Sequence, residues 1–189
     1  DGSRRATWAH LLDNLAPLPT LRWNATNATS VEVFAQVLGD EQGIAPGGNP
    51  LNTYLGWPGY DDRLETDPEL RATAANTLAY MQSWSQGNAW PQFPAARIRS
   101  QDRAKDAART IERMEAVLKT AIPTNLIIGD GGFGTLEGAG GLGAVNEMLL
   151  QSAGGRVRLF PQVPVGTPAS FQNLRARGAF LISAELLAD

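Results

Sequence analysis

The sequence predicts a mainly α-helical body followed by a β tail. Apolar residues recur at helical spacing in four segments of the first 153 residues. Gly154 and Gly155 interrupt this pattern, and short apolar and β-branched runs separated by turn residues follow them. We therefore expect one unit over residues 1–153 and the start of a β domain over residues 154–189.

The composition is that of a folded protein and excludes several functions. Hydrophobic residues make up 43% of the 189 residues and charged residues 19%, which is a globular balance. The net charge is -3 and the basic residues are dispersed among acids, so no nucleic-acid partner is expected. Because cysteine is absent and only one histidine is present, we expect no metal site, no cofactor and no thiolate chemistry. Any catalysis must depend on carboxylates. No apolar run reaches the roughly 18 residues of a membrane span.

Four helices are expected in the body. The first ends before Pro17, and the second begins at Asp67, an N-cap residue followed by Pro68 in the first turn. The third begins near Ser100 and the fourth covers about residues 138–152. Their apolar stripes are Trp8, Leu11, Leu12 and Leu15; Leu70, Ala74, Leu78, Met81 and Trp84; Ala107, Ile111, Met114, Leu118 and Ala121; and Leu142, Val145 and Leu149.

Strands and one long loop complete the expected elements. A strand is expected in SVEVFAQVL (residues 30–38), and three short strands are expected in RVRLF, NLRAR and AFLISAEL of the tail. Residues 39–67 are rich in Gly, Pro and Asn and contain Tyr54, Trp57 and Tyr60. Long irregular loops in compact domains are usually functional, so we expect this segment to line a cleft.

A glycine-rich stretch, GDGGFGTLEGAGGLG, covers residues 129–143, and its first six residues match GxGxxG. A dinucleotide-binding fold would alternate strands with helices and would place an acid about 20 residues further on. Neither feature is present, and Asp130 inside the motif would repel a pyrophosphate. The stretch is therefore not interpreted as a phosphate-binding loop.

The same stretch can instead hold carboxylates. Glycines allow a tight loop that projects a few side chains, and here Asp130, Phe133 and Glu137 are the candidates. A carboxylate beside an aromatic ring is a common arrangement for sugar hydrolysis, where one acid protonates the leaving oxygen and another activates water or attacks. The structural alternative is that Asp130 is a turn residue and Glu137 a helix N-terminal acid.

A family resemblance favours the functional interpretation. NEMLLQS (146–152), RVRLFP (156–161) and NLRARGAFLISAEL (173–186) resemble, in this order, the C-terminal part of bacterial glycoside hydrolases of the family 95 type and their α-L-fucosidase-like relatives. Upstream, WAHLLDNLAPLPT, NTLAYMQSW and GNAWPQFPAAR are similar to the later barrel helices and loops of that group. The resemblance covers most of the chain.

The resemblance implies a fold and an activity. Members have a catalytic (α/α)6 barrel followed by a β-sandwich-like domain, so residues 1–153 would be the C-terminal part of the barrel and residues 154–189 the first antiparallel strands. By position, Asp130 matches the general base of the inverting fucosidase branch. Some relatives carry a glycine loop that ends in glutamate, which Glu137 resembles equally. The base and the sugar are therefore left open.

The resemblance also implies that the barrel is incomplete. In that family the general acid and the helper asparagines lie upstream of this loop, and the 128 residues before Gly129 do not contain them. We expect a fragment or subunit that is inactive alone and is completed by another chain or a missing N-terminal region. Because such relatives are usually exported, we expect a secreted, extracellular or periplasmic protein.

Further residues are candidates for binding the carbohydrate substrate. Asn88, Trp90 and Gln92 lie in GNAWPQFP, where an aromatic face and amides suit the C–H faces and hydroxyls of a sugar. Trp57 and Phe133 could stack on a sugar in the same way. Packing of Trp90 under its loop is the structural alternative. The alternative functions are a non-catalytic carbohydrate-binding or structural fragment and an α-helical interaction module.

Overall fold

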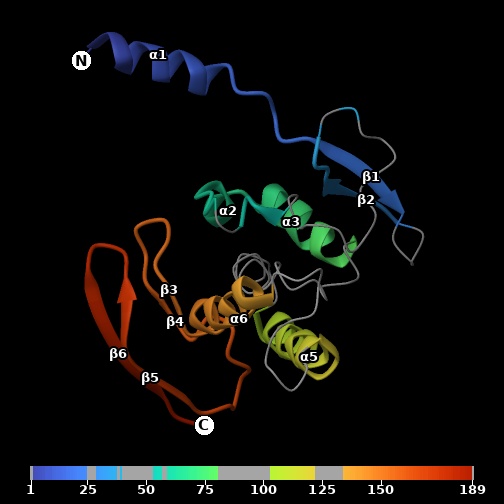
Figure 1. Cartoon of the computed structure of the whole chain (residues 1–189). Helices are drawn as coiled ribbons and strands as arrows, with labels where there is room; N and C mark the ends of the chain where they lie inside the picture. Colours follow the sequence, from blue (N-terminus) through green and yellow to red (C-terminus); the bar gives the residue numbers. More distant parts are fainter. Residues whose placement is uncertain are drawn as a thin grey trace.

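The fold is described from a computed structural model that covers residues 2–24, 29–37, 39, 53–56, 59–80, 103–121 and 134–188. In the two longest helices it describes the side chains of residues 107–116, 119 and 141–149. Within these ranges the chain is a mixed α/β structure with five helices, three two-stranded antiparallel sheets and no closed barrel (Figure 1).

Helices and strands follow one another in the order shown in Figure 1. The helices are α1 (Gly2–Asp13), α2 (Arg63–Thr66), α3 (Pro68–Tyr80), α5 (Arg103–Ala121) and α6 (Gly134–Leu149). The strands are β1 (Thr20–Asn24), β2 (Ser30–Phe34), β3 (Leu150–Gln151), β4 (Arg158–Leu159), β5 (Ala169–Ala176) and β6 (Phe180–Leu186). The three sheets are β1–β2, β3–β4 and β5–β6.

A β-hairpin packs on helix α3 in the N-terminal half. Strand β2 was expected, but its partner β1, which pairs with it from Thr20 opposite Phe34, was not. Val33 is fully buried, and the backbone N–H of Phe34 donates a 2.8 Å hydrogen bond to Oγ1 of Thr77 on α3. These contacts give β1 and β2 a supporting helix, which a two-stranded sheet needs for stability.

Helix α3 begins as the sequence predicts. Oδ1 of Asp67 accepts hydrogen bonds of 3.0 Å from the backbone N–H groups of Glu69 and Leu70, so Asp67 is an N-cap. Leu78 of the expected stripe is fully buried. Met81 and Trp84, which were expected to extend this stripe, lie outside the described residues.

Helix α5 also buries the expected face. Ala107 and Met114 are buried, and Ile111 between them is half-buried. Oγ1 of Thr110 donates a 3.1 Å hydrogen bond to Oε1 of Gln162, and both residues are fully buried. This bond joins α5 to the segment that follows β4.

Helix α6 presents a different face from the one expected. Leu142 is 72% exposed and Val145 is 43% exposed, whereas Ala144 and Met148 are buried. The stretch is rich in glycine and alanine, so its apolar pattern does not define a single face, and the packing partners decide which side is covered. The helix ends at Leu149 rather than near residue 152, because Leu150 and Gln151 pair with β4.

The β tail and the end of α6 share one hydrophobic core. It contains five buried residues, namely Leu150, Phe160, Val163, Phe171 and Ala176. The rings of Phe160 and Phe171 lie 5.2 Å apart between centroids. The expected tail strands are present as β4, β5 and β6, with antiparallel pairing. Residues on both sides of position 153 contribute to this core. The division of the chain into two domains at this position stays a prediction.

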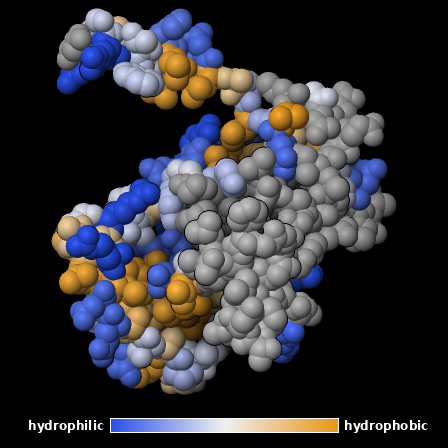
Figure 2. Space-filling model, in the orientation of Figure 1, coloured by the Kyte–Doolittle hydropathy of each residue, from blue (hydrophilic) through white to orange (hydrophobic). Residues whose placement is uncertain are grey.

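Helix α1 lies apart from the other elements (Figure 1). Every residue of it is exposed, including Trp8 at 63%, Leu12 at 66% and the following Leu15 at 62%. Figure 2 shows apolar side chains on the part of α1 nearest the rest of the chain. None of the helices in the described ranges is long and apolar enough to cross a membrane.

Candidate functional site

Most of the candidate residues for catalysis and substrate binding that were predicted from the sequence lie outside the residues that the structure describes. These residues are Asp130, Phe133, Asn88, Trp90, Gln92 and Trp57. Glu137 lies in the first turn of α6, but its side chain is not among those described. The geometry below therefore comes from other residues.

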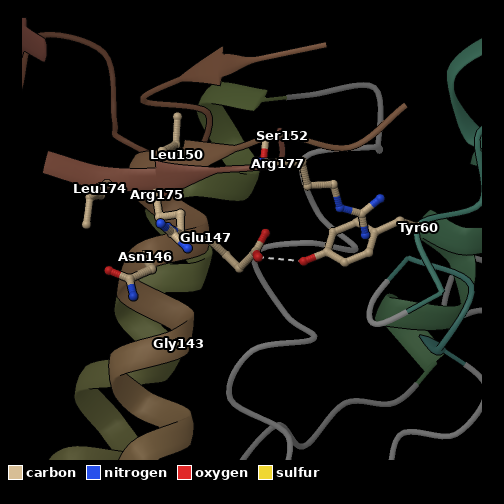
Figure 3. Close-up of a pocket in the computed structure, with 9 residues that line it drawn as sticks. All are labelled: Tyr60, Gly143, Asn146, Glu147, Leu150, Ser152, Leu174, Arg175 and Arg177. Atoms are coloured by element: carbon tan, nitrogen blue, oxygen red, sulfur yellow. Dashed lines mark hydrogen bonds between the residues drawn. The ribbon is translucent and has the colours of Figure 1, made fainter. Parts of the chain in front are cut away.

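A pocket of about 320 Å³ lies where the segment before α2 meets the C-terminal half of α6 and strand β5. Tyr60 and Glu147 point toward each other at its wall, and β5 contributes Arg175 and the Arg177 that follows it (Figure 3). Asn146, Ser152, Gly143, Leu150 and Leu174 complete the lining. The lining thus combines hydrogen-bonding and charged groups with a small apolar surface.

Tyr60 and Glu147 are joined by a hydrogen bond. The phenol of Tyr60 donates to Oε1 of Glu147 at 2.6 Å, and the bond is partly buried (Figure 3). Hydrogen bonds to an ionised carboxylate are shorter and stronger than those between neutral groups. The bond therefore fixes the Glu147 carboxylate at the wall of the pocket.

Arg177 lies over the ring of Tyr60. Its guanidinium carbon is 4.7 Å from the ring centroid, which is a cation–π contact. The backbone N–H of Arg177 donates a 2.9 Å hydrogen bond to Oγ of Ser152. Among the described residues, no carboxylate lies within ion-pair distance of Arg175 or Arg177. Both cations therefore keep N–H groups available to a ligand.

The backbone of Tyr60 is held in an unfavourable conformation. Its φ is 48°, in the left-handed region that large side chains rarely adopt. The turn that imposes this φ is closed by backbone hydrogen bonds from Gly59 N–H to the Tyr54 carbonyl, at 2.8 Å, and from Asp61 N–H to the Leu55 carbonyl, at 3.0 Å. Such outliers cluster at functional sites. Here the turn aims the Tyr60 side chain at Glu147.

Ion pairs connect the helix that follows Tyr60 to the β tail. The carboxylate of Glu65 on α2 pairs with Arg158 on β4 and lies 3.9 Å from the guanidinium of Arg156. The Glu65 side chain is only 14% exposed, so solvent screens this pairing weakly. Between Tyr60 and α2, the side-chain hydrogen bond from Arg63 to Asp61 raises the pKa of the Arg63 guanidinium. The segment carrying Tyr60 is thus anchored to β4.

This pocket could be predicted from the sequence only in part. Tyr60 confirms that part of the segment 39–67 lines a cleft, while Tyr54 is 41% exposed and is not among the lining residues. Glu147 was not proposed as a site residue, although it stands in the NEMLLQS block. Arg175 and Arg177 were also missed. Their spacing of two residues places them on one side of the strand end, opposite buried Ala176, and this spacing was the available signal.

The pocket lies at the C-terminal end of α6, whereas the candidate acid Glu137 stands in its first turn. Glu147 stands 13 positions after Gly134, the first residue of the helix, and a rise of 1.5 Å per residue separates them by about 20 Å. Among the described residues that line the pocket, Glu147 is the only carboxylate. Because hydrolysis by paired carboxylates needs two, the described groups of this pocket are suited to binding a ligand. The described residues include no cluster of three or more His, Asp or Glu that could hold a metal ion.

Comparisons with protein-family models, with curated proteins and with solved structures found no match for this chain.

Proposed function

We propose that this chain is part of a glycoside hydrolase that acts on an oligosaccharide or polysaccharide. The enzyme would be α-L-fucosidase-like and inverting, with Asp130 or Glu137 as its general base. The observation that carries the proposal is the order of elements around α6. The glycine-rich stretch 129–143 runs into this helix, which begins at Gly134, the NEMLLQS block begins in its last turn, and antiparallel strands pack against that end. This is the order that the resemblance implies.

The start of α6 suits a carboxylate base. The helix begins at Gly134, so Asp130 precedes it by four positions and Glu137 lies in its first turn. The positive end of the helix dipole favours the ionised form of a carboxylate near the N-terminus, and the ionised form is the one that activates water. The second carboxyl of an inverting site would stand roughly 6.5–9.5 Å away. Under this proposal it comes from the region that completes the barrel.

Helix α1 supports the proposed incompleteness of the barrel. Trp8, Leu11 and Leu12 of α1 and Leu15 shortly after it recur at helical spacing, and all four are exposed. Contiguous exposed apolar side chains mark a surface that another protein segment covers. We infer that another chain or an N-terminal region packs on this face, and that this chain is inactive without it. From the resemblance, we also infer that the enzyme is exported.

A non-catalytic carbohydrate-binding role is the second candidate. The pocket beside Tyr60 favours it, because its carboxylate, amide, hydroxyl and guanidinium groups are those that hold sugar hydroxyls. In this case the loop acids would have no part in chemistry.

Hydrolysis of a panel of nitrophenyl glycosides by the native protein that contains this chain distinguishes the two candidates. The hydrolase proposal expects turnover of at least one glycoside. It also expects that one of Asp130→Asn and Glu137→Gln lowers kcat by about 10²–10⁴-fold, the typical contribution of a general base.

The variant that retains activity serves as the matched control, because it alters a carboxylate in the same stretch. Turnover that survives both substitutions removes these two acids from the mechanism. Failure to hydrolyse any glycoside, together with retained sugar binding, leaves the non-catalytic candidate.

A further inference from the structure

We propose that the pocket beside Tyr60 binds an acidic sugar, namely a uronic acid residue. Its carboxylate would pair with Arg175 and Arg177, and its hydroxyls would bind Glu147 and Asn146. The inference rests on the proposal that this chain binds carbohydrate. It adds the charge of the sugar and a second binding position at the far end of α6 from Glu137.

The charges around the pocket favour an anionic ligand. Arg175 and Arg177 carry two positive charges, and Glu147 carries the only negative charge in the part of the lining that the structure describes. One oxygen of that carboxylate already accepts the hydrogen bond from Tyr60. A guanidinium binds a carboxylate through two parallel N–H···O bonds, a geometry that lysine does not offer.

Arg177 and Tyr60 are held in place before a ligand arrives. Arg177 is fixed by its stacking on Tyr60 at 4.7 Å and by its backbone hydrogen bond to Ser152. Arg175, two residues earlier, is an exposed residue of β5 that lines the same pocket. The strained turn holds Tyr60 itself, with φ of 48°. Preorganisation of this kind lowers the entropic cost of binding.

The remaining lining favours a sugar over a small inorganic anion. The volume of about 320 Å³ lies at the lower end of the range of small-molecule pockets, roughly 300–1,000 Å³, and is far larger than one phosphate needs. Glu147 accepts hydrogen bonds from hydroxyl groups but repels a free anion. Leu150 and Leu174 offer apolar surface to sugar C–H groups. A ligand with a carboxylate at one end and hydroxyls at the other satisfies all of these groups.

Titration of the 189-residue chain, followed by the Nε–H resonances of its arginines in NMR spectra, tests the inference. The probes are the methyl glycosides of galacturonate and glucuronate, their methyl esters and inorganic phosphate. At least one uronate should bind about tenfold more tightly than its ester, since a charge-assisted hydrogen bond is worth at least 1.4 kcal/mol, which is tenfold.

Substitutions in the pocket locate the site. Arg175→Gln and Arg177→Gln should each weaken uronate binding about tenfold. Arg177→Lys should weaken it as well, because lysine keeps the charge and loses the paired geometry. Arg156→Gln is the matched control, because Arg156 is an exposed arginine outside the pocket. Its variant should bind uronate like the unmodified chain.

Three results would overturn the inference. They are equal affinity for a uronate and its ester, unchanged affinity when both Arg175 and Arg177 are replaced, and phosphate binding as tight as uronate binding. None of these results depends on hydrolysis, so each leaves the hydrolase proposal standing. Conversely, uronate binding by the native protein that contains this chain, without hydrolysis of any glycoside, supports the pocket and contradicts the hydrolase.

Discussion

The phenol of Tyr60 donates a 2.6 Å hydrogen bond to Oε1 of Glu147, and this bond joins segments that are 87 residues apart in the chain. It connects the turn before α2 to the last part of α6. Arg177 from the end of β5 covers the same tyrosine ring. One side chain therefore links three parts of the fold at the wall of the pocket.

Replacement of Tyr60 by phenylalanine should destabilise the protein. The ring is retained, but the hydrogen bond to the carboxylate is lost, and such bonds contribute about 1.5–3 kcal/mol. We expect the free energy of unfolding in urea to fall by that amount. Tyr54→Phe is the control, because Tyr54 is 41% exposed and its hydroxyl should matter by less than about 0.5 kcal/mol. Equal effects of the two substitutions would mean that the Tyr60 bond does not contribute to stability.

The two arginines that pair with Glu65 should differ in their contribution to stability. Arg158 is 23% exposed, whereas Arg156 is 63% exposed and its guanidinium lies 3.9 Å from the carboxylate. Arg158→Ala leaves a poorly solvated carboxylate and should lower the free energy of unfolding by about 1–3 kcal/mol. Arg156→Ala should change it by less than about 1 kcal/mol, as exposed pairs do. Thermal unfolding of both variants measures the difference, and the reverse order would contradict this account.

Alanine at Gly59 should have the opposite effect from alanine at Gly141. A Cβ at Gly59 would lie 2.6 Å from the backbone carbonyl oxygen of Tyr54, so the turn that carries Tyr60 must shift. We expect Gly59→Ala to lower stability by about 1–3 kcal/mol. A Cβ at Gly141, inside α6, meets nothing within 4 Å, so Gly141→Ala should raise stability by about 0.5–1 kcal/mol. Urea unfolding of both variants checks the two signs, and a shift of the same sign would argue against this geometry.

The buried face of α6 can be tested with two truncations of similar size. Met148 is 9% exposed, and Met148→Ala should cost about 2–5 kcal/mol through lost burial and the cavity that remains. Leu142 is 72% exposed, and Leu142→Ala should change the free energy of unfolding by less than about 0.5 kcal/mol. Denaturant unfolding of both variants provides the measurement. A larger loss of stability in Leu142→Ala than in Met148→Ala would mean that α6 buries the face predicted from the apolar pattern.

Features that depend on neighbouring residues could be predicted from the sequence. The N-cap at Asp67 is an example, because its carboxylate bonds backbone groups two and three residues away. The stripe of α5 is another, because Ala107, Ile111 and Met114 recur at helical spacing among polar residues. The tail strands were predicted in the same way, from short apolar runs between turn residues.

Features that depend on distant partners were decided by the tertiary structure. TLRWN alternates polar and apolar residues as a strand does, but it is only five residues long, and β1 is stabilised by its pairing with β2, which α3 supports. The buried face of α6 was decided by what packs on it, since glycine and alanine give that helix little apolar contrast. The pocket unites Tyr60, Glu147 and Arg177, whose distances along the chain carry no information about their contact. Local hydrogen bonds and periodic patterns depend on residues a few positions apart in the chain, so the sequence alone determines them. A binding site forms only when packing brings remote side chains within a few ångströms of one another.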